Sequence, residues 1–102
     1  MDNRKVPEII IKYVDFITKE KPQIKKVYLF GSYAKEENYP ASDVDLAVIF
    51  ENLTDTFETQ VELMKMRRMF DTRIEPHIFL ESDFTPSNPL ANEVIKHGIR
   101  LN

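Results

Sequence analysis

Hydrophobic side chains recur at three- and four-residue steps near the start of the chain, and this spacing predicts an amphipathic helix over residues Val6 to Lys21. Pro7 fits the first turn of that helix, where a missing N–H costs nothing. Pro22 ends it, because the residue before a proline avoids the helical conformation. The apolar positions that we expect to face the core are Val6, Ile9, Ile10, Tyr13, Val14 and Ile17.

Two short apolar runs follow, and each predicts a strand. Residues Lys26 to Phe30 are rich in β-branched and aromatic side chains and stop at Gly31, as a buried strand would. Residues Val44 to Phe50 are apolar on both faces after the first two positions, which indicates a central strand covered on both sides. The polar residues between these runs, Ser32 to Ala41, predict a turn that follows a short helical segment.

A second long helix is predicted from Thr54 or Asp55, either of which can cap it, to about Phe70. Its apolar side chains form two rows, which suits a helix that covers the sheet. One row contains Phe57, Val61 and Met64, and the other contains Leu63, Met66 and Phe70. We expect Met64, Met66 and Met69 to fill the core, although methionine is also common on adaptable binding surfaces.

The rest of the pattern predicts a third strand over Arg73 to Leu80 and a last helix over Pro89 to His97. Pro76 cannot donate to a strand ladder, so we expect the third strand to lie at an edge or to contain a bulge. Gly98 fits the C′ position that closes the last helix. This order of elements predicts a small α/β (α+β) fold, with a mixed β-sheet of three or more strands flanked by helices.

Composition narrows the classes of function. The 102 residues suffice for one core, so we expect a single domain over residues 1–102. A net charge of −3 disfavours extended nucleic-acid binding. The absence of cysteine excludes disulfides and thiolate zinc sites, and two histidines leave carboxylates as the ligands for any metal. No apolar run approaches the roughly 20 residues that span a bilayer and no signal-like stretch follows Met1, so we expect a cytoplasmic protein without a membrane partner.

Two carboxylates at the start of the second strand are the main candidates for chemistry. Asp43 and Asp45 are two residues apart, so in a strand they share one face. Two anions beside a hydrophobic core are costly unless they are paired or bind a metal, and no Lys or Arg is adjacent in sequence. Mg²⁺ prefers one or two carboxylates completed by water and phosphate oxygens, so the pair fits a metal–nucleotide site. The alternative is a pair of loop carboxylates or a turn cap.

Gly31 and Ser32 stand where the first strand meets the turn. Without a Cβ, Gly31 lets the backbone approach a phosphate closely, and Ser32 can donate from its N–H and its hydroxyl. The alternative is an ordinary turn. A phosphate cradle opposite a pair of metal-binding carboxylates is what phosphoryl or nucleotidyl transfer requires, because such transfer depends on positioning and charge neutralisation.

With these residues, the sequence resembles the minimal, single-domain branch of the nucleotidyltransferase superfamily with the DNA polymerase β-like fold. Gly31-Ser32, ten intervening residues and Asp43-Val44-Asp45-Leu46 reproduce the signature of that family. The resemblance implies transfer of a nucleoside monophosphate from an NTP to a hydroxyl, with two Mg²⁺ ions held by three carboxylates. Small prokaryotic members resemble the antitoxins of HEPN/MNT toxin–antitoxin modules, which AMPylate a tyrosine of the HEPN partner.

The resemblance also implies a third carboxylate on the strand after the second long helix, and there Glu75 is the candidate. Glutamate takes a place more often held by aspartate, and Glu36 stands where many relatives carry a second glycine. Glu75 could instead be a solvated charge on an edge strand. His77 shares a strand face with Glu75 and could touch substrate or orient the carboxylate, but a lone histidine is more often structural.

Other basic residues give a weaker signal. Lys35 could meet a phosphate. Arg67, Arg68 and Arg73 form a local basic patch that could meet a triphosphate, an acidic partner or only solvent.

The sequence therefore predicts a Mg²⁺-dependent nucleotidyltransferase. Asp43, Asp45 and Glu75 are its predicted catalytic and metal-binding residues, and Gly31 and Ser32 its predicted nucleotide-binding residues. ATP is the expected donor, a HEPN-domain protein is the expected partner, and self-association is left open. The alternatives are a binding module that neutralises its partner by docking alone, and transfer to a small molecule such as an aminoglycoside.

Overall fold

The computed structural model describes residues 6–31 and 43–102. The predicted short helical segment after Gly31 lies outside these residues, as do Ser32, Lys35 and Glu36. In the described ranges, no helix has the length and apolar character needed to cross a membrane. In chain order the elements are α1 (Glu8–Glu20), β1 (Ile24–Phe30), β2 (Val44–Phe50), α2 (Thr56–Met66), η1 (Arg67–Met69), β3 (Ile74–Leu80), η2 (Glu81–Asp83), α3 (Pro89–His97) and β4 (Ile99–Arg100).

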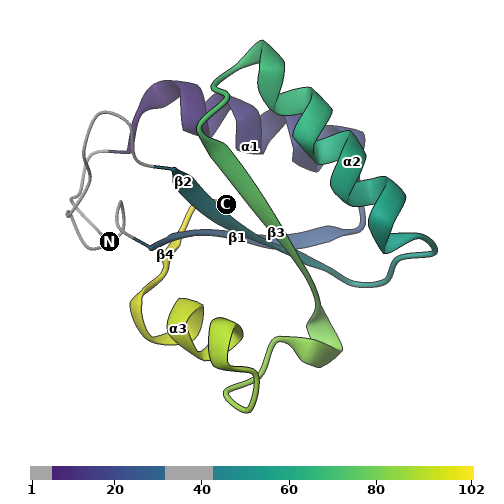
Figure 1. The fold of residues 1–102 in the computed structure, drawn as a ribbon, viewed down its shortest axis with the longest axis vertical. Helices are drawn as coiled ribbons and strands as arrows, with labels where there is room; N and C mark the ends of the chain where they lie inside the picture. Colours follow the sequence, from purple (N-terminus) through teal and green to yellow (C-terminus); the bar gives the residue numbers. More distant parts are fainter. Residues whose placement is uncertain (1–5, 32–42) are drawn as a thin grey trace.

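The four strands of the described residues form one mixed sheet in the order β3-β2-β1-β4 (Figure 1). β1 runs antiparallel to both β2 and β4, whereas β2 and β3 are parallel. α2 lies in the connection between β2 and β3, as expected for a parallel crossover. The predicted mixed sheet flanked by helices is confirmed.

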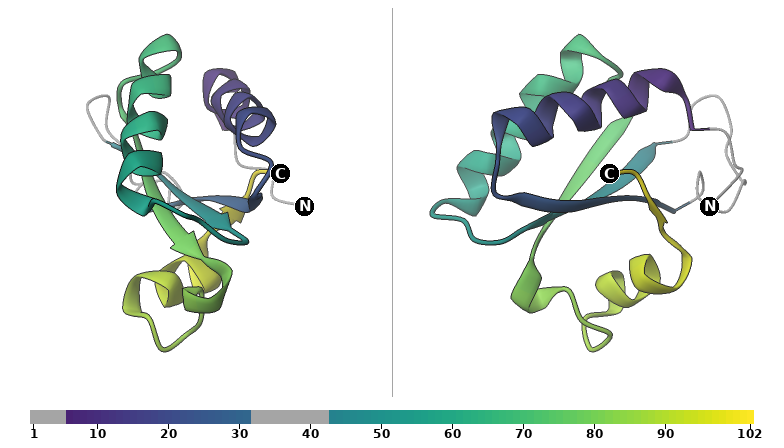
Figure 2. Two further views of the ribbon diagram at one scale, coloured as in Figure 1. Left: turned by 90° about the vertical axis from the view of Figure 1, so that its right-hand side faces the viewer. Right: turned by 180° about the vertical axis from the view of Figure 1, so that it is seen from behind.

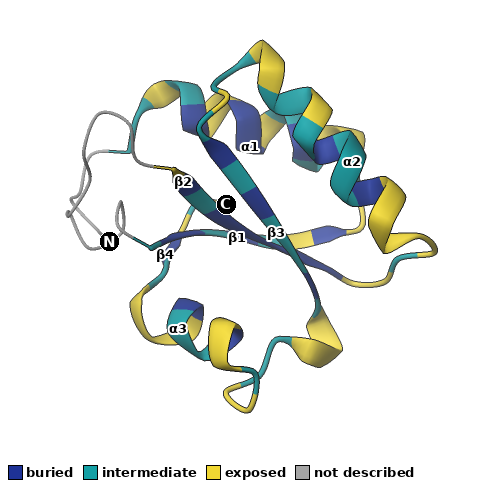
Figure 3. Cartoon of the chain, in the orientation of Figure 1, coloured by how far each residue is buried: buried dark blue, intermediate teal, exposed yellow. Residues whose placement is uncertain are grey.

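Helices cover both faces of the sheet, α1 and α2 on one and α3 on the other (Figure 2). The larger core lies under α1 and α2, and its fully buried members include Ile10, Tyr13, Ile17, Val27, Leu46, Val48, Phe50 and Leu63. The smaller core lies under α3 and contains Phe30, Ala47, Ile49, Phe79, Ala91 and Val94. Alternate residues of β2 enter the two cores because successive strand side chains point to opposite faces. Every residue of β2 except Asp45 is buried, which confirms the predicted central strand (Figure 3).

The ends of the long helices differ in detail from the sequence pattern. α1 begins at Glu8, with Pro7 at its N-cap rather than in its first turn. Asp55 caps α2 by accepting a hydrogen bond from the Glu58 backbone N–H at 2.9 Å. α2 ends at Met66 and tightens into the 3₁₀ turn η1, so it stops short of the predicted end at Phe70.

The two apolar rows of α2 have different environments. Leu63 is buried in the larger core, and Met66 and Phe70 pack against that core. In the other row, the side chain of Phe57 is 80% exposed. Met69, in η1, is 63% exposed, so the prediction that it fills the core was wrong. The 3₁₀ turn shifts the helical phase after Met66, which turns Met69 away from the sheet.

β3 is an edge strand, as Pro76 predicts, and its outer side is bonded to neighbouring groups. Gln60 of α2 donates to the Pro76 carbonyl at 2.8 Å. Arg67 donates through Nη1 to the Ile74 carbonyl at 2.7 Å, and the Ile74 N–H donates to the Asp71 carbonyl at 3.1 Å. Because the N–H and C=O of one strand residue point to the same side, Pro76 removes no hydrogen bond from the ladder with β2.

The last helix and the C-terminal strand complete the sheet. α3 spans Pro89–His97 as predicted, and Asn88 caps it. Gly98 follows directly with extended backbone, and a Cβ there would lie 2.5 Å from the Val94 carbonyl oxygen. Glycine is therefore needed at the end of α3 because the backbone passes too close to Val94 for a side chain, and not because the residue adopts a left-handed conformation. The chain then pairs with β1 as β4, a strand of two residues that no sequence pattern predicts.

Candidate active site

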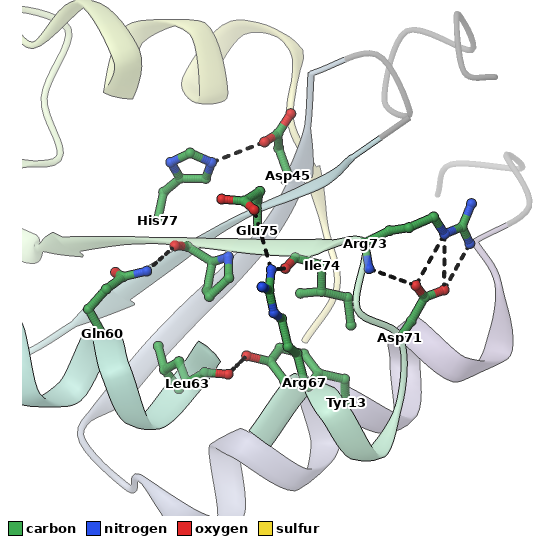
Figure 4. A network of polar contacts seen from close by, with 11 residues as sticks. Tyr13, Asp45, Gln60, Leu63, Arg67, Asp71, Arg73, Ile74, Glu75 and His77 are labelled. Carbon is green, nitrogen blue, oxygen red and sulfur yellow. Dashed lines mark hydrogen bonds and ion pairs between the residues drawn. The ribbon is translucent and has the colours of Figure 1, made fainter. Parts of the chain in front are cut away.

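The candidate site lies at the beginning of β2, where Asp45 has a neighbour on each side. In the sheet register Asp45 is opposite Phe30 of β1 and opposite Glu75 of β3. Asp45 lies two and four residues from Ala47 and Ile49, which face α3, so its side chain projects from that same face of the sheet. Two carboxylates far apart in the sequence thus lie side by side in adjacent strands (Figure 4).

Gly31 follows β1 and packs against the carboxylate of Asp45. Its φ is 77°, in the left-handed region that glycine adopts readily. A Cβ at this position would lie 2.5 Å from Asp45 Oδ2, closer than two such atoms can approach. Glycine is therefore required here by the backbone conformation and by the neighbouring carboxylate. The approach of a phosphate to Gly31 stays a prediction.

His77 holds the other oxygen of Asp45. The two residues come from adjacent strands, and His77 Nε2 lies 3.0 Å from Asp45 Oδ1. The imidazole also packs edge-on against Phe30, with ring centroids 5.2 Å apart. His77 thus orients the carboxylate of Asp45, whereas the sequence left open an orienting role toward Glu75. The hydrogen bond fixes one oxygen of Asp45 while the second faces Gly31.

Glu75 has a different partner, Arg67 of η1. Arg67 Nη1 lies 3.3 Å from Glu75 Oε2, and the same nitrogen donates to the Ile74 carbonyl. Both side chains are partly exposed, with 22% of the surface accessible for Arg67 and 39% for Glu75. Arg67 was predicted only as part of a basic patch, and its pairing with Glu75 was missed because the two residues are eight apart across a turn.

The three arginines of that patch do not act together. Arg73 forms an ion pair with Asp71, with Arg73 Nη2 2.8 Å from Asp71 Oδ2. The hydrogen bonds from Arg73 lower the pKa of the Asp71 carboxyl below its usual range. Arg68 is exposed. Arg67, the remaining member of the patch, contacts the predicted site residue Glu75.

The buried phenol of Tyr13 lies beneath the site. Its hydroxyl donates to the Leu63 carbonyl at 2.9 Å. Burial raises the pKa of Tyr13 above its ordinary value, and the positive charge of Arg67 opposes part of that rise. Tyr13 and Arg67 thus join the site to the larger core (Figure 4).

The remaining predicted site residues are placed only in part. β2 begins at Val44, so Asp43 lies immediately before the strand, where it is exposed. Ser32 lies outside the described residues. Within residues 6–31 and 43–102, no group of three or more His, Asp or Glu side chains is arranged to hold a metal ion. The roles of Asp43, Asp45, Glu75, Gly31 and Ser32 in catalysis and binding stay predictions.

The comparison with protein families decides the class of the protein. Residues 12–102 match the family described as "Polymerase beta, Nucleotidyltransferase". The chain belongs to this family. The nucleotidyltransferase is also 32% identical over 95 residues to "Putative protein adenylyltransferase MJ1379" of Methanocaldococcus jannaschii, an alignment that covers 92% of this chain and 87% of that relative. The predicted enzyme class is thus confirmed at the level of the family.

Solved structures show the same fold. A chain described as "Crystal structure of the toxin-antitoxin with AMP-PNP" matches the nucleotidyltransferase with a TM-score of 0.67 and 21% identity, over 90% of this chain and 72% of the other. A chain from the complex of a tri-AMPylated Shewanella oneidensis HEPN toxin with an MNT antitoxin matches with a TM-score of 0.57 and 20% identity, over 92% and 71%. At these identities the likeness establishes the fold of the nucleotidyltransferase.

Proposed function

We propose that this nucleotidyltransferase transfers AMP from ATP, with Mg²⁺, to a tyrosine hydroxyl of a HEPN-domain partner and thereby acts as an antitoxin. The observation that carries the proposal is the pairing of Asp45 with Glu75 across β2 and β3, beside Gly31. These residues belong to three different strands or strand ends, and a fold that only docks has no need to bring carboxylates together there.

The transfer assigns a role to each candidate residue. The acceptor oxygen forms a bond to the α-phosphorus of ATP, the bond from that phosphorus to the bridging oxygen breaks, and pyrophosphate leaves. Glu75 orients the acceptor hydroxyl and takes its proton. Gly31 and Ser32 hold the triphosphate, and Asp43 and Asp45 bind the metal.

The described carboxylates fit Mg²⁺ by their chemistry. Mg²⁺ binds oxygen ligands and keeps several positions for water and phosphate, so it needs only one or two carboxylates from the protein. Asp45 and Glu75 supply such a pair, and Asp43 stands two residues before Asp45. We propose two ions, held by Asp43, Asp45 and Glu75. Bound Mg²⁺ neutralises triphosphate charge and polarises the phosphorus under attack.

The acceptor is proposed from the relatives. One curated relative is named a protein adenylyltransferase, and a structural neighbour comes from a complex with a tri-AMPylated HEPN toxin. We propose that this nucleotidyltransferase acts in the cytoplasm, where ATP and such a partner meet.

The experiment is transfer of label from α-labelled ATP to the proteins of a native host lysate, with and without Mg²⁺. Wild type is compared with Asp45→Asn, which keeps a hydrogen-bond acceptor for His77 but removes the negative charge. Asp83→Asn is the matched control, because Asp83 is an exposed aspartate of η2. A labelled band that needs Mg²⁺, persists in the control and is lost in Asp45→Asn supports the proposal and identifies the acceptor by mass. Absence of label with folded wild type contradicts it.

A docking module is the second candidate. Glutamate at position 75, where relatives more often have aspartate, favours this candidate, because the longer side chain fits a tight octahedral metal site less well. Co-expression with a HEPN-domain partner separates the two functions. An enzyme loses neutralisation of its partner when Asp45 becomes Asn, whereas a docking module keeps it.

A further inference from the structure

We infer that Arg67 is a positioning residue, which holds the Glu75 carboxylate beside Asp45 in the geometry that transfer requires. The inference rests on the proposed function, because it assigns Arg67 a part in that same site. The main evidence is the 3.3 Å contact between Arg67 Nη1 and Glu75 Oε2, which joins the turn η1 to the edge strand β3.

Glu75 needs such a partner because of its length and its place. Compared with aspartate, glutamate has one more methylene and one more rotatable bond, so its carboxylate samples more positions. Glu75 lies on an edge strand, with β2 on one side only, and 39% of its side chain is exposed. Strand packing alone therefore does not select one position of the carboxylate.

Arg67 is itself held in place, which lets it act as a support. Its Nη1 carries two N–H groups, and the nitrogen contacts both the Ile74 carbonyl at 2.7 Å and Glu75 Oε2. Only 22% of the side chain is exposed, and the charge is close enough to affect the buried phenol of Tyr13. The backbone of Arg67 also caps α2 through its N–H. Hydrogen bonds therefore hold the Arg67 side chain at both ends, at its backbone in η1 and at its guanidinium through the Ile74 carbonyl.

The charges around Glu75 also support a positioning role for Arg67. Asp45 and Glu75 are adjacent in register, so their negative charges repel each other. Asp45 contacts His77 at Oδ1 and Glu75 contacts Arg67 at Oε2, so each carboxylate has its own basic neighbour. Within the described residues, each carboxylate keeps one oxygen outside these pairs. Arg67 thus offsets the repulsion without occupying both oxygens of Glu75.

The test uses the full chain and four substitutions. Arg67→Met removes the charge and keeps the length, Arg67→Lys keeps the charge, and Glu75→Gln removes the acceptor charge, alone and combined with Arg67→Met. Arg68→Met is the matched control on the same turn, because Arg68 is exposed. Calorimetry measures the apparent affinity for Mg²⁺ at a fixed concentration of AMP-CPP, a non-cleavable ATP analogue. The labelled-transfer assay supplies kcat and KM, and thermal melting verifies folding.

We expect Arg67→Met to weaken Mg²⁺ binding and lower kcat, each by about 10-fold or more, with KM for ATP changed less than about 2-fold. Arg67→Lys recovers part of both losses, Arg68→Met matches wild type, and Arg67→Met adds nothing in the Glu75→Gln background. If Arg67→Met does not fold, Arg67→Gln takes its place.

The inference is overturned if Arg67→Met behaves as wild type, or if its loss is the same with and without Glu75. It is also overturned if wild type does not bind Mg²⁺ with the analogue. If wild type binds Mg²⁺ with the expected pattern of variants but transfers no label, the proposed function fails while the placement of Glu75 by Arg67 stands.

Discussion

Gly31 packs directly against Asp45, so that a Cβ at position 31 would lie 2.5 Å from Asp45 Oδ2. The contact joins the end of β1 to the beginning of β2, and it coincides with a φ of 77° at Gly31. Asp45 cannot simply swing away from an added methyl group, because its other oxygen bonds to His77. The position of the carboxylate and the backbone of β1 are therefore coupled.

Gly31→Ala is expected to destabilise the protein by about 1–3 kcal/mol, because alanine is strained at this φ and its Cβ displaces the carboxylate. Urea unfolding of the variant and of wild type measures the loss. In the Asp45→Ala background the steric part disappears, so the same substitution should cost less there. Equal costs in both backgrounds would show that the backbone strain alone accounts for the effect.

Tyr13→Phe removes a buried hydrogen bond from the larger core. The Leu63 carbonyl loses the Tyr13 hydroxyl as donor but keeps the Arg67 N–H, so we expect a loss of about 0.5–1.5 kcal/mol rather than the cost of an unsatisfied carbonyl. Chemical denaturation at neutral pH measures it. A loss above 3 kcal/mol would mean that the hydroxyl has a further role in packing.

The same residue predicts a response to alkaline pH. Burial raises the pKa of Tyr13 in the folded state, so the neutral phenol contributes stability that is present below the unfolded pKa of about 10 and is lost as the pH rises above it. The stability of wild type should therefore fall more steeply above pH 10 than that of Tyr13→Phe. Parallel curves for the two proteins would contradict this assignment.

Asp71 predicts a response to acid. Hydrogen bonds from Arg73 lower its pKa in the folded state, so its contribution is present above the unfolded pKa of about 4 and is lost as the pH falls through the folded value. Asp71→Asn should cost about 0.5–1 kcal/mol at pH 7 and little at the lowest pH where the protein folds. Thermal melting across that pH range shows whether the stabilities of wild type and Asp71→Asn converge at low pH. A difference in stability that does not change with pH would mean that Asp71 stabilises the turn through hydrogen bonds that do not depend on its charge.

Asp55 caps the N-terminus of α2, and α2 continues directly into η1, which begins at Arg67. Asp55→Ala leaves the Glu58 N–H without its acceptor and should cost about 1 kcal/mol. Asp55→Ser, which retains a capping oxygen, is the control and should recover most of the loss in a urea titration. A loss in both variants would point to the charge of Asp55 rather than to its hydrogen bond.

The elements of the fold could be predicted because their patterns are local. The strand Val44–Phe50 and the helix Pro89–His97 have the same bounds in the sequence prediction and in the structure. The strand β4 could not be predicted, because two residues show no periodicity and their pairing with β1 depends on the finished sheet. Met69 was misplaced for a related reason, since the change from α-helix to 3₁₀ turn leaves no mark in the spacing of apolar residues.

The candidate site was predictable as a set of residue types and only partly as an arrangement. Asp45 and Glu75 were named from their motif and family, and the structure brings them into adjacent register. The partners of these carboxylates depend on how strands align and how a turn projects, which sequence spacing does not encode. His77 stands two residues after Glu75, so a shared face was foreseeable, whereas its bond to Asp45 required the register between β2 and β3.

The outer side of β3 has a consequence for how this protein can meet others. At Ile74 and Pro76 each outward main-chain group is already bonded or absent: the N–H and carbonyl of Ile74 bond to Asp71 and Arg67, Pro76 has no N–H, and its carbonyl bonds to Gln60. An extended peptide, or β3 of another copy, therefore finds no main-chain partners along this stretch and cannot prolong the sheet there. A protein that approaches this stretch of β3 meets side chains there rather than free main-chain groups, so its affinity for the stretch depends on its sequence and surface shape rather than on a generic strand.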